Sequence, residues 1–391
     1  MTKRHCSSFG CDLAVIHLSL PGGKLCGMKI LLISDAWQPQ VNGVVRTLEN
    51  TRAELTAMGH EILVVGPDRF RSMPMPGYPE IPLSLLPGRK MEQIIESFLP
   101  DCIHIATEGP LGLAARRWCV HHEVVFTTSY HTRFPEYLRM RAPVPTRWTY
   151  AWLRRFHGAA HRTMVRTRTQ KAELGQRGFR HLDVWPGGVD VQLFRPRKQR
   201  VIDLPGPIAL YAGRVAPEKT LEDFLAVDFP GSKVIVGDGP ARKALQAKFP
   251  EAHFLGYHYG ENLARLVASA DVFVFPSRTD TLGLVMLEAM ASGVPVAAYP
   301  VPGPVDVVLE GVSGCLDEDL AAAMEKAMRL DPTDCRTFAA EFSWRHCSQI
   351  FLDLVQPIPN LPADPNLLEP SAQGAIRRLT AAPESIPRNV Q

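Results

Sequence analysis

Two acidic residues lie in and beside an apolar stretch, at a spacing that suits the binding of a polar ligand. Asp280 precedes the run LGLVMLEAMASGVPV, and Glu288 lies within it. A helix of such residues should be buried, and a buried carboxylate without a partner is costly. We therefore expect both acids to face a ligand at the helix start, where Thr281, Leu282 and Gly283 supply free backbone N–H groups. In the alternative interpretation, Asp280 caps the helix and Glu288 pairs with a buried Arg.

A pair of cations follows another apolar run, in YAGRVAPEKT. Arg214 and Lys219 are five residues apart on a loop and a helix start. Together they suit a diphosphate, because Arg binds oxyanions as a planar fork and Lys as a point charge. The alternative is a charged loop that faces solvent.

Two glycine-containing turns also follow apolar runs. In PQVNGVVRTL, Asn42 and Gly43 precede a helical pattern, so Gly43 would let the backbone approach a ligand at the helix start. In VIVGDGP, the turn that contains Gly239 could bring the backbone near a nucleoside. Each turn alone is weak evidence, since an ordinary tight turn explains either sequence.

The elements that must position these residues alternate between strand and helix. Short apolar runs separated by helical patterns predict buried parallel strands joined by right-handed crossovers. We therefore predict an α/β protein with two Rossmann-like, doubly wound domains that face a cleft, because ligands bind outside the carboxyl ends of such strands. The predicted strands are 28–34, 61–66, 102–107, 124–129 and 163–167, then 208–213, 232–237, 252–256, 271–277 and 294–299.

Domain limits follow from shifts in composition. The stretch 195–207 is charged and then rich in Pro and Gly, as linkers are, so we place one domain at 28–200 and the other at 201–342. We expect 343–356 to form a helix that packs back toward the first domain. Residues 1–27 are interpreted as a non-native or extended N-terminus, with a signal peptide as the alternative. The Pro-rich residues 357–391 should be a disordered tail.

The overall composition is that of a soluble globular protein. It is 46% hydrophobic and 21% charged, and no apolar run approaches the roughly 20 residues that span a bilayer. The net charge is only +3, but residues 131–180 hold twelve Arg or Lys against two Glu, a patch that favours anions. The eight Cys show no metal-binding spacing and are expected to be reduced thiols. The acidic triplet 317–319 is interpreted as helix-start acids rather than a metal site.

Taken together, the motifs resemble a known enzyme family. NGV, GR-x4-K, GDGP and D-x7-E-A-M-A-x-G-x-P-V occur in the order found in retaining, nucleotide-sugar-dependent glycosyltransferases of the GT-B architecture. VNGVVRTL, HIATEGPLGLAAR, FTTSYHTRFPEYL and AAYPVPGPVDVV are most similar to bacterial sulfoquinovosyl-, glucuronosyl- and glucosyl-diacylglycerol synthases and to GDP-mannose-dependent mannosyltransferases. The chain departs from this pattern at Asp280, where the family usually has Glu. It departs again at Gly187, where the branch commonly has Arg; the missing cation weakens any claim that the donor sugar is anionic.

The resemblance implies transfer with retention from a nucleotide diphosphate sugar, with no cofactor and no metal. Positive groups would stabilise the departing diphosphate, and acids would orient the sugar and ribose. Catalysis is therefore assigned to His131, Arg214, Lys219 and Asp280, of which His131 would contact the donor sugar. Donor binding is assigned to Asn42, Gly43, Gly239, Gly256, Tyr257, Thr281, Leu282, Gly283 and Glu288, with Gly256 and Tyr257 near the base.

The acceptor is expected to be a lipid such as diacylglycerol. Residues 133–156 mix Arg with Phe, Tyr and Trp, which suits an anionic membrane surface, although an ordinary helix with a solvated basic face has the same composition. This implies a cytoplasmic protein, peripheral at the inner face of the plasma membrane. Three alternatives are GDP-mannose-dependent mannosyl transfer to a lipid or glycan, a catalytically silent nucleotide-sugar-binding protein, and a nucleic-acid-binding protein. No nucleic-acid-binding signature supports the last of these.

Overall fold

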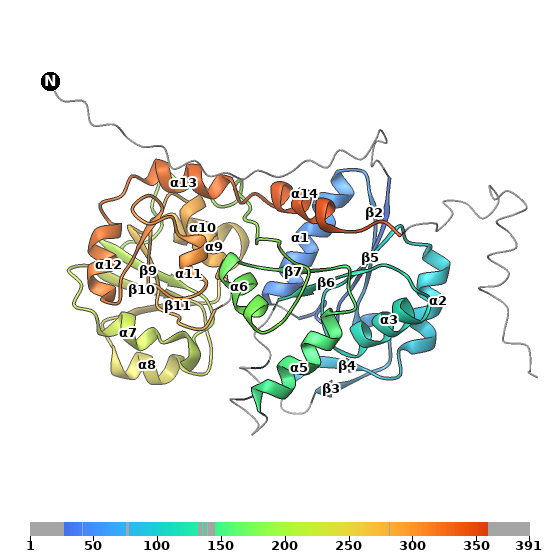
Figure 1. Cartoon of the computed structure of the whole chain (residues 1–391). Helices are drawn as coiled ribbons and strands as arrows, with labels where there is room; N and C mark the ends of the chain where they lie inside the picture. The colour runs from blue at the N-terminus through green and yellow to red at the C-terminus, as the bar shows by residue number, and fades with distance from the viewer. Residues whose placement is uncertain are drawn as a thin grey trace, which may run out of the picture.

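The computed structural model describes residues 27–40, 42–75, 78–131, 135, 139, 145–280 and 282–358. Within them, six parallel strands form one sheet in the order β2-β1-β5-β6-β7-β8, and six more form a second in the order β11-β10-β9-β12-β13-β14. The sheets define a first and a second lobe, which lie side by side (Figure 1). The predicted α/β class with two Rossmann-like sheets is therefore confirmed.

The elements of the first lobe run from residue 29 to residue 184. Its helices alternate with the strands of the sheet, and a two-stranded antiparallel hairpin is inserted before α2. The elements are β1 (Lys29–Ile33), α1 (Gly43–Ala57), β2 (Glu61–Val65), η1 (Pro67–Arg69), β3 (Ser72–Met75), β4 (Tyr78–Ser84), α2 (Gly88–Phe98), β5 (Cys102–Ile105), α3 (Pro110–His121), β6 (Thr127–Tyr130), α5 (Thr146–His157), β7 (Arg162–Val165), α6 (Arg168–Gln176) and β8 (Leu182–Val184).

The elements of the second lobe follow the segment 185–207. They alternate in the same way and are followed by a final helix. The elements are β9 (Ile208–Ala212), η2 (Pro217–Lys219), α7 (Leu221–Ala226), β10 (Ser232–Val236), α8 (Arg242–Lys248), β11 (His253–Gly256), α9 (Gly260–Val267), β12 (Val272–Phe275), α10 (Leu284–Ala291), β13 (Val296–Ala298), α11 (Pro304–Val307), β14 (Gly314–Leu316), α12 (Leu320–Ala327), α13 (Pro332–Ala340) and α14 (Trp344–Leu354).

Apolar side chains alternate between the two faces of each sheet, as the continuous apolar runs predict. In β9, Leu210 packs into the cluster that includes α9, α10 and α13, whereas the adjacent Tyr211 packs into the cluster that includes α7 and α12. In β1, Leu31 and Leu32 belong to different clusters in the same manner. Because both faces are covered by helices, the exposed functional surface of each sheet is its carboxyl edge.

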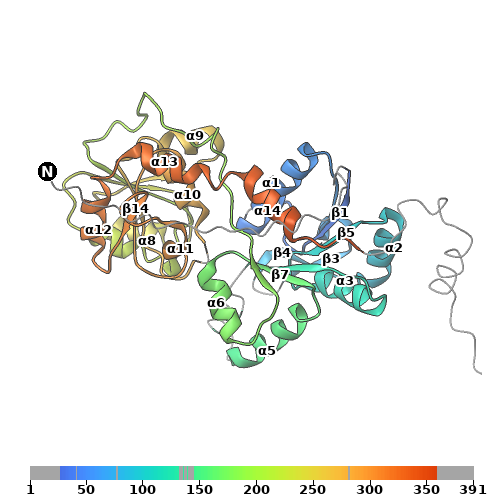
Figure 2. The same cartoon turned by 45° about the horizontal axis from the view of Figure 1, so that its top comes forward.

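The chain returns to the first lobe through α14. Phe351 is fully buried in a cluster with Ile30, Leu48 and Trp185, and its ring centroid lies 4.9 Å from that of Trp185. Figures 1 and 2 both show α14 beside α1, on a face of the first sheet. The final helix therefore joins the hydrophobic core of the first lobe.

Two segments that connect the lobes form hydrogen bonds with one another where they cross. Val189 donates its backbone N–H to the Phe342 carbonyl over 2.8 Å, and the indole Nε1 of Trp185 donates to the Cys347 carbonyl over 3.1 Å. At the crossing, a Cβ on Gly188 would lie 2.5 Å from the ring of Trp344. Only glycine allows this close approach, so the sequence GGVD helps fix how the lobes are joined.

Three elements are missing from the sequence prediction. The three-residue strands β8 and β14 form the same edge of each sheet, and the β3–β4 hairpin lies outside both sheets. No helix among the described residues is long and apolar enough to cross a membrane. Residues 1–26 and 359–391, on which the terminal predictions fall, lie outside the described residues.

Candidate functional site

The loops that follow β9 and β12 lie next to one another, because these strands pair in the sheet. Val272 is in register with Ala209, and Phe273 with Leu210. The order of the second sheet reverses between β9 and β12, since β10 lies on one side of β9 and β12 on the other. Such a switch point is where open α/β sheets bind ligands. The predicted cations lie on the first of these loops and Asp280 on the second.

Lys219 and Asp280 form an ion pair that bridges the two loops. The Nζ of Lys219 donates to Oδ1 of Asp280 over 2.5 Å, and the two side chains are 18% and 20% exposed. The hydroxyl of Thr220 donates to the Pro276 carbonyl over 2.6 Å, which further ties the loops together. The N-cap of α10 is Gly283, and among the described residues Asp280 accepts no hydrogen bond from the start of that helix. The described contacts of Asp280 therefore favour the pair with Lys219 over the alternative in which it caps the helix.

Arg214 lies on the same loop with its side chain exposed. Its backbone is held by the hydroxyl of Tyr211, which donates to the Arg214 carbonyl over 3.0 Å. Among the described residues the guanidinium has no ion-pair partner. Arg214 and Lys219 thus give the carboxyl edge of β9 two positive groups, one open to solvent and one neutralised by Asp280.

Glu288 is buried in α10 and pairs with a residue of the other lobe. Its side chain is 3% exposed, and its Oε1 forms an ion pair with Nη2 of Arg46, in α1. Burial raises the pKa of the Glu288 carboxyl, and Arg46 opposes that rise. The structure therefore gives Glu288 the Arg partner of the alternative interpretation, although Arg46 is itself 39% exposed. The proposed contact with ribose stays a prediction.

Asn42 and Gly43 begin α1 at the carboxyl edge of the first sheet. The Oδ1 of Asn42 accepts from the backbone N–H groups of Val44 and Val45, each over 3.0 Å, so Asn42 is the N-cap of the helix. A Cβ on Gly43 would meet nothing within 4 Å. The open space beside Gly43 is compatible with the predicted approach of a ligand, while Asn42 has an evident structural role.

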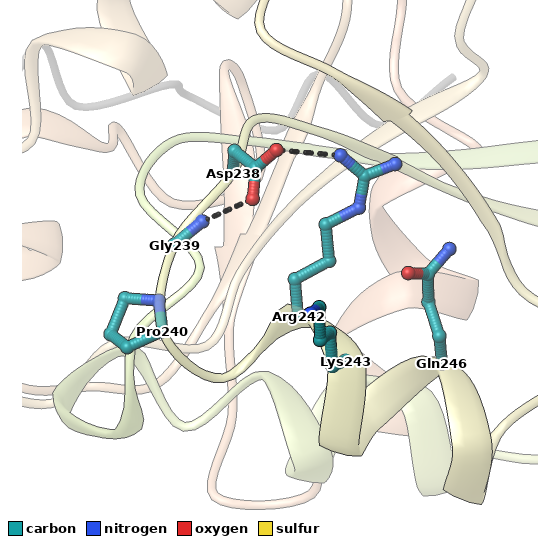
Figure 3. Close-up of a pocket in the computed structure, with 6 residues that line it drawn as sticks. All are labelled: Asp238, Gly239, Pro240, Arg242, Lys243 and Gln246. Carbon is teal, nitrogen blue, oxygen red and sulfur yellow. Dashed lines mark hydrogen bonds and ion pairs between the residues drawn. The ribbon is translucent and has the colours of Figure 1, made fainter.

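The Gly-Asp-Gly-Pro turn lines a hollow at the start of α8. The Asp238 carboxylate of this turn accepts two hydrogen bonds, from Gly239 N–H over 2.7 Å and from Nη1 of Arg242 over 2.6 Å (Figure 3). These two bonds lower the pKa of Asp238. A Cβ on Gly239 would collide with the Val215 carbonyl, so this glycine is needed for loop packing. The hollow has a volume of about 400 Å³ and is lined by Asp238, Gly239, Pro240, Arg242, Lys243 and Gln246.

Gly256 and Tyr257 lie beside this turn, at the end of β11. The hydroxyl of Tyr257 donates to the Asp238 carbonyl over 3.0 Å. Its ring stacks on that of Tyr259 with centroids 5.9 Å apart and planes 15° apart, and both side chains are exposed. Gly256 adopts a φ of +78°, a conformation that favours glycine. Two exposed aromatic faces at this position suit the stacking of a planar ring.

His131 follows β6 at the carboxyl edge of the first sheet. Its ring lies edge-on to Trp185, with centroids 5.7 Å apart, and its Nε2 is buried without a hydrogen-bond partner among the described residues. Burial, with a smaller effect of nearby Arg166, lowers the pKa of His131 well below its ordinary value. His131 is therefore a neutral group at physiological pH, able to orient a ligand through a hydrogen bond.

The start of α10 packs against the segment that follows β8. Gly283 precedes the helix with a φ of +73°, and Leu282 is 6% exposed. A Cβ on Gly187 would collide with the tips of Leu282 and Leu284. The loop that precedes α10, with Leu282 and Gly283, therefore lies against the segment that carries Gly187. Thr281 lies outside the described residues.

Sequence reasoning missed Arg46, Arg166 and Tyr259, which stacks on the predicted Tyr257. Arg46 pairs with Glu288, and its only signal was its position one turn after Asn42-Gly43. Arg166 lies directly after β7, within the run TMVRT that was assigned to a strand. A charged residue at the carboxyl end of an apolar run was the signal that could have identified it.

The acids at 317–319 serve the start of α12. Asp319 accepts from the N–H groups of Ala321 and Ala322 as the N-cap, and Asp317 pairs with Lys326 over 2.8 Å. The predicted helix-start role is confirmed for Asp319. Among the described residues, no cluster of three or more His, Cys, Asp or Glu is arranged to hold a metal ion.

Comparisons with known proteins agree across both lobes. The family model Glycosyltransferase Family 4 matches residues 41–193, and Glycosyl transferases group 1 matches residues 206–330. The chain is similar to a GDP-mannose-dependent alpha-mannosyltransferase of Mycobacterium tuberculosis, with 33% identity over 75% of this chain and 84% of the relative. It is similar to a sulfoquinovosyl transferase of Arabidopsis thaliana, with 33% identity over 70% of this chain and 60% of the relative.

Two further similarities concern a more distant relative and a solved structure. An alpha-monoglucosyldiacylglycerol synthase of Acholeplasma laidlawii is 26% identical over 69% of this chain and 79% of its own length. The crystal structure of sucrose-phosphate synthase from Thermosynechococcus elongatus aligns with a TM-score of 0.64 at 21% identity. That alignment covers 84% of this chain and 98% of the other, and it supports the two-lobed fold.

The Arg46–Glu288 pair generates a prediction for stability. Arg46→Met should lower the free energy of unfolding at pH 7.5 by roughly 1–3 kcal/mol, less than for a fully buried pair because Arg46 is partly exposed. Burial places the folded-state pKa of Glu288 above its unfolded value, and loss of Arg46 raises it further. The folded variant then binds a proton more readily than the unfolded chain. The difference in free energy of unfolding between variant and wild type should therefore shrink as pH falls toward 5. Urea unfolding at both pH values measures it.

The matched control removes the Glu288 charge that Arg46→Met leaves without a partner. Glu288→Gln in the Arg46→Met background should recover most of the loss at pH 7.5, because an amide can be buried at lower cost than a carboxylate. A deficit that is the same at both pH values, or that the added Glu288→Gln substitution does not relieve, would contradict this account of the pair.

Proposed function

Because the chain belongs to the glycosyltransferases of family 4 and group 1 and is a GT-B enzyme, we propose that it transfers a hexose or hexuronic acid from a UDP-linked donor to a lipid. The proposed acceptor is diacylglycerol or a similar lipid, and the anomeric configuration is retained. The observation that carries this proposal is the group at the β9–β12 switch point, where Lys219 and Asp280 pair beside the open guanidinium of Arg214.

The proposed chemistry is mainly electrostatic. The C1–O bond to the diphosphate breaks while the acceptor oxygen bonds to C1 on the same face, and the hydroxyl proton passes to the departing phosphate. Arg214 and Lys219 stabilise the charge that grows on the diphosphate, with the N–H groups at the start of α10. Lys219 would exchange Asp280 for phosphate, freeing Asp280 to accept from sugar hydroxyls. With these cations available, we expect no divalent metal to be required.

The remaining groups would orient the donor. His131, neutral through burial, would hydrogen-bond the sugar through Nε2. The exposed rings of Tyr257 and Tyr259, beside the Gly-Asp-Gly-Pro turn, would stack with the base. Gly43 and the start of α1 would approach the donor from the first lobe. Glu288 would reach the ribose by sharing its carboxylate with Arg46.

A lipid acceptor is supported by one exposed surface of the first lobe. We define the α5 surface as Arg147, Trp148, Trp152 and Arg155, all exposed, of which Trp148 is 63% and Trp152 39% exposed. The neighbouring Leu153 and Phe156 are buried and anchor the helix to the core. Exposed indoles flanked by Arg suit the interface of an anionic membrane. The likeness to a glucosyldiacylglycerol synthase supports the same acceptor class.

A second candidate is GDP-mannose-dependent mannosyl transfer to a lipid or glycan. The similarity to the mycobacterial mannosyltransferase favours it. In either case we propose a cytoplasmic location with peripheral contact at the inner face of the plasma membrane.

A donor panel tests the function. Purified chain is incubated with diacylglycerol and with UDP-glucose, UDP-glucuronate, UDP-galactose, UDP-sulfoquinovose or GDP-mannose, and the lipid product is identified by mass. We expect a glycosyl-diacylglycerol from a UDP donor, at a rate unchanged by EDTA. Product from GDP-mannose alone would move the assignment to the second candidate. Absence of any product, with a lipid extract as an additional acceptor, would contradict the proposal.

The α5 surface is tested separately by sedimentation with liposomes. We expect the protein to bind vesicles rich in phosphatidylglycerol, more strongly at low than at high salt. The double variant Trp148→Ser and Trp152→Ser should bind roughly tenfold more weakly because both interfacial rings are lost.

The matched control is Leu309→Ser, which removes an exposed apolar side chain from the second lobe and should bind like the wild type. Equal binding by the wild type and the double variant, or no binding at either salt, would contradict a membrane role for this surface.

A further inference from the structure

Arg166 is a buried cation without a carboxylate partner. It follows β7 at the carboxyl edge of the first sheet and is 5% exposed. Its backbone N–H donates to Oε1 of Gln170, but its side-chain Nη1 is buried and has no hydrogen-bond partner among the described residues. No ion pair joins it to any residue that the structure describes. Buried charges are normally paired, so this arrangement needs an explanation.

The side chains around Arg166 leave a second unpaired polar group beside it. The guanidinium carbon lies 5.2 Å from the centre of the Trp185 ring, and His131 contacts the same indole edge-on. The Nε2 of His131 is also buried and unpartnered among the described residues. Burial lowers the pKa of Arg166 to about 10, so the guanidinium stays charged at neutral pH. The charged guanidinium of Arg166 and the neutral imidazole of His131 therefore both lie against the ring of Trp185.

This pair of groups lies near the loop that precedes α10. A Cβ on Gly187 would be 2.8 Å from Nη2 of Arg166 and would collide with Leu282 and Leu284. The guanidinium thus occupies the space beside Gly187, the position at which the sequence resemblance led us to expect an Arg. The cation that the sequence lacks at position 187 is supplied by position 166.

The loop 280–284 is therefore flanked by two separate positive centres. Lys219 contacts Asp280 at one end, and Arg166 lies near Leu282 and Leu284 at the other. Arg214 and Lys219 already provide the charge that a diphosphate needs. A purely structural Arg would satisfy its donors with protein carbonyls or a carboxylate, as Arg336 does with three backbone carbonyls. Arg166 has neither arrangement, which leaves its charge available to a second anion.

We propose that Arg166, with His131 beside it, binds a carboxylate or sulfonate carried by the transferred sugar. The chain would then prefer a hexuronic acid or a sulfonated hexose over a neutral hexose as donor. This inference rests on the proposed function, because it names the class of sugar that the same site transfers. It also restores the case that the absence of an Arg at position 187 had weakened, since Arg166, which follows β7, supplies a cation beside Gly187.

The test compares donors that differ only in the charge of the sugar. Calorimetry measures Kd for UDP-glucuronate, UDP-sulfoquinovose, UDP-glucose and free UDP, with GDP-mannuronate and GDP-mannose as the matched pair if UDP does not bind. Wild type should bind the anionic sugars more tightly than the neutral one. Arg166→Met should weaken binding of the anionic sugars by about 10- to 100-fold, the range for a hydrogen-bonded ion pair, and affect UDP-glucose far less.

Two controls separate charge recognition from folding. Arg168→Met removes an exposed cation two residues away and should leave the preference for anionic sugars intact. Arg166→Met should melt no lower than the wild type, since it removes a buried charge that has no carboxylate partner among the described residues, and the Met side chain can still pack on Trp185. A lower melting temperature, together with equal weakening of every donor, would overturn the inference in favour of a structural role.

The remaining outcomes distinguish this inference from the proposed function. Transfer from UDP-glucose with no preference for the anionic sugars would overturn the role of Arg166 and leave the transferase activity standing. Charge-selective binding that Arg166→Met abolishes, without transfer to any lipid, would support the anion site and contradict the proposed reaction. If Arg166→Met weakens the binding of free UDP and of every donor equally, Arg166 would be placed at the diphosphate and the inference overturned.

Discussion

A carboxylate buried in an apolar helix is the constraint on which this structure depends. Glu288 lies in α10, which is otherwise packed into the core of the second lobe, and its charge is balanced by Arg46 from the first lobe. The pair connects α1 to α10, whose first residues both face the carboxyl edges of the sheets. An interaction between lobes therefore also aligns the helix starts available for an anionic ligand.

The rest of the site follows from the order of the strands. Because the second sheet reverses between β9 and β12, the loops after them are adjacent, and Lys219 can reach Asp280. Because β6 and β7 are neighbours in the first sheet, His131 and Arg166 leave it side by side and share Trp185. One loop is thus placed between a cation of its own lobe and a cation of the other, which suits a ligand with charge at two points.

Local patterns predicted most of the fold, because runs such as KILLI and VFVF are buried on both faces and need no distant partner to be recognised. The three-residue strands β8 and β14 have too short a pattern to be distinguished from loops. Motif order also located Lys219 and Asp280. The pairing of Glu288 with Arg46 depends on a contact between lobes, and the position of Arg166 beside Gly187 depends on the pairing of β7 with β8. The local signals of Arg46 and Arg166 mark the two residues but do not say which groups they meet in space.

The central claim is that positive groups at the β9–β12 switch point hold a nucleoside diphosphate. Calorimetric titration of UDP and GDP, without sugar or lipid, into wild type, Lys219→Met and Asp280→Asn tests it directly. The account predicts that one nucleotide binds wild type and that Lys219→Met weakens it roughly tenfold or more. Asp280→Asn should bind at least as tightly as wild type, because Lys219 is released from its partner. Binding that is absent from wild type, or equal in wild type and Lys219→Met, would contradict the account.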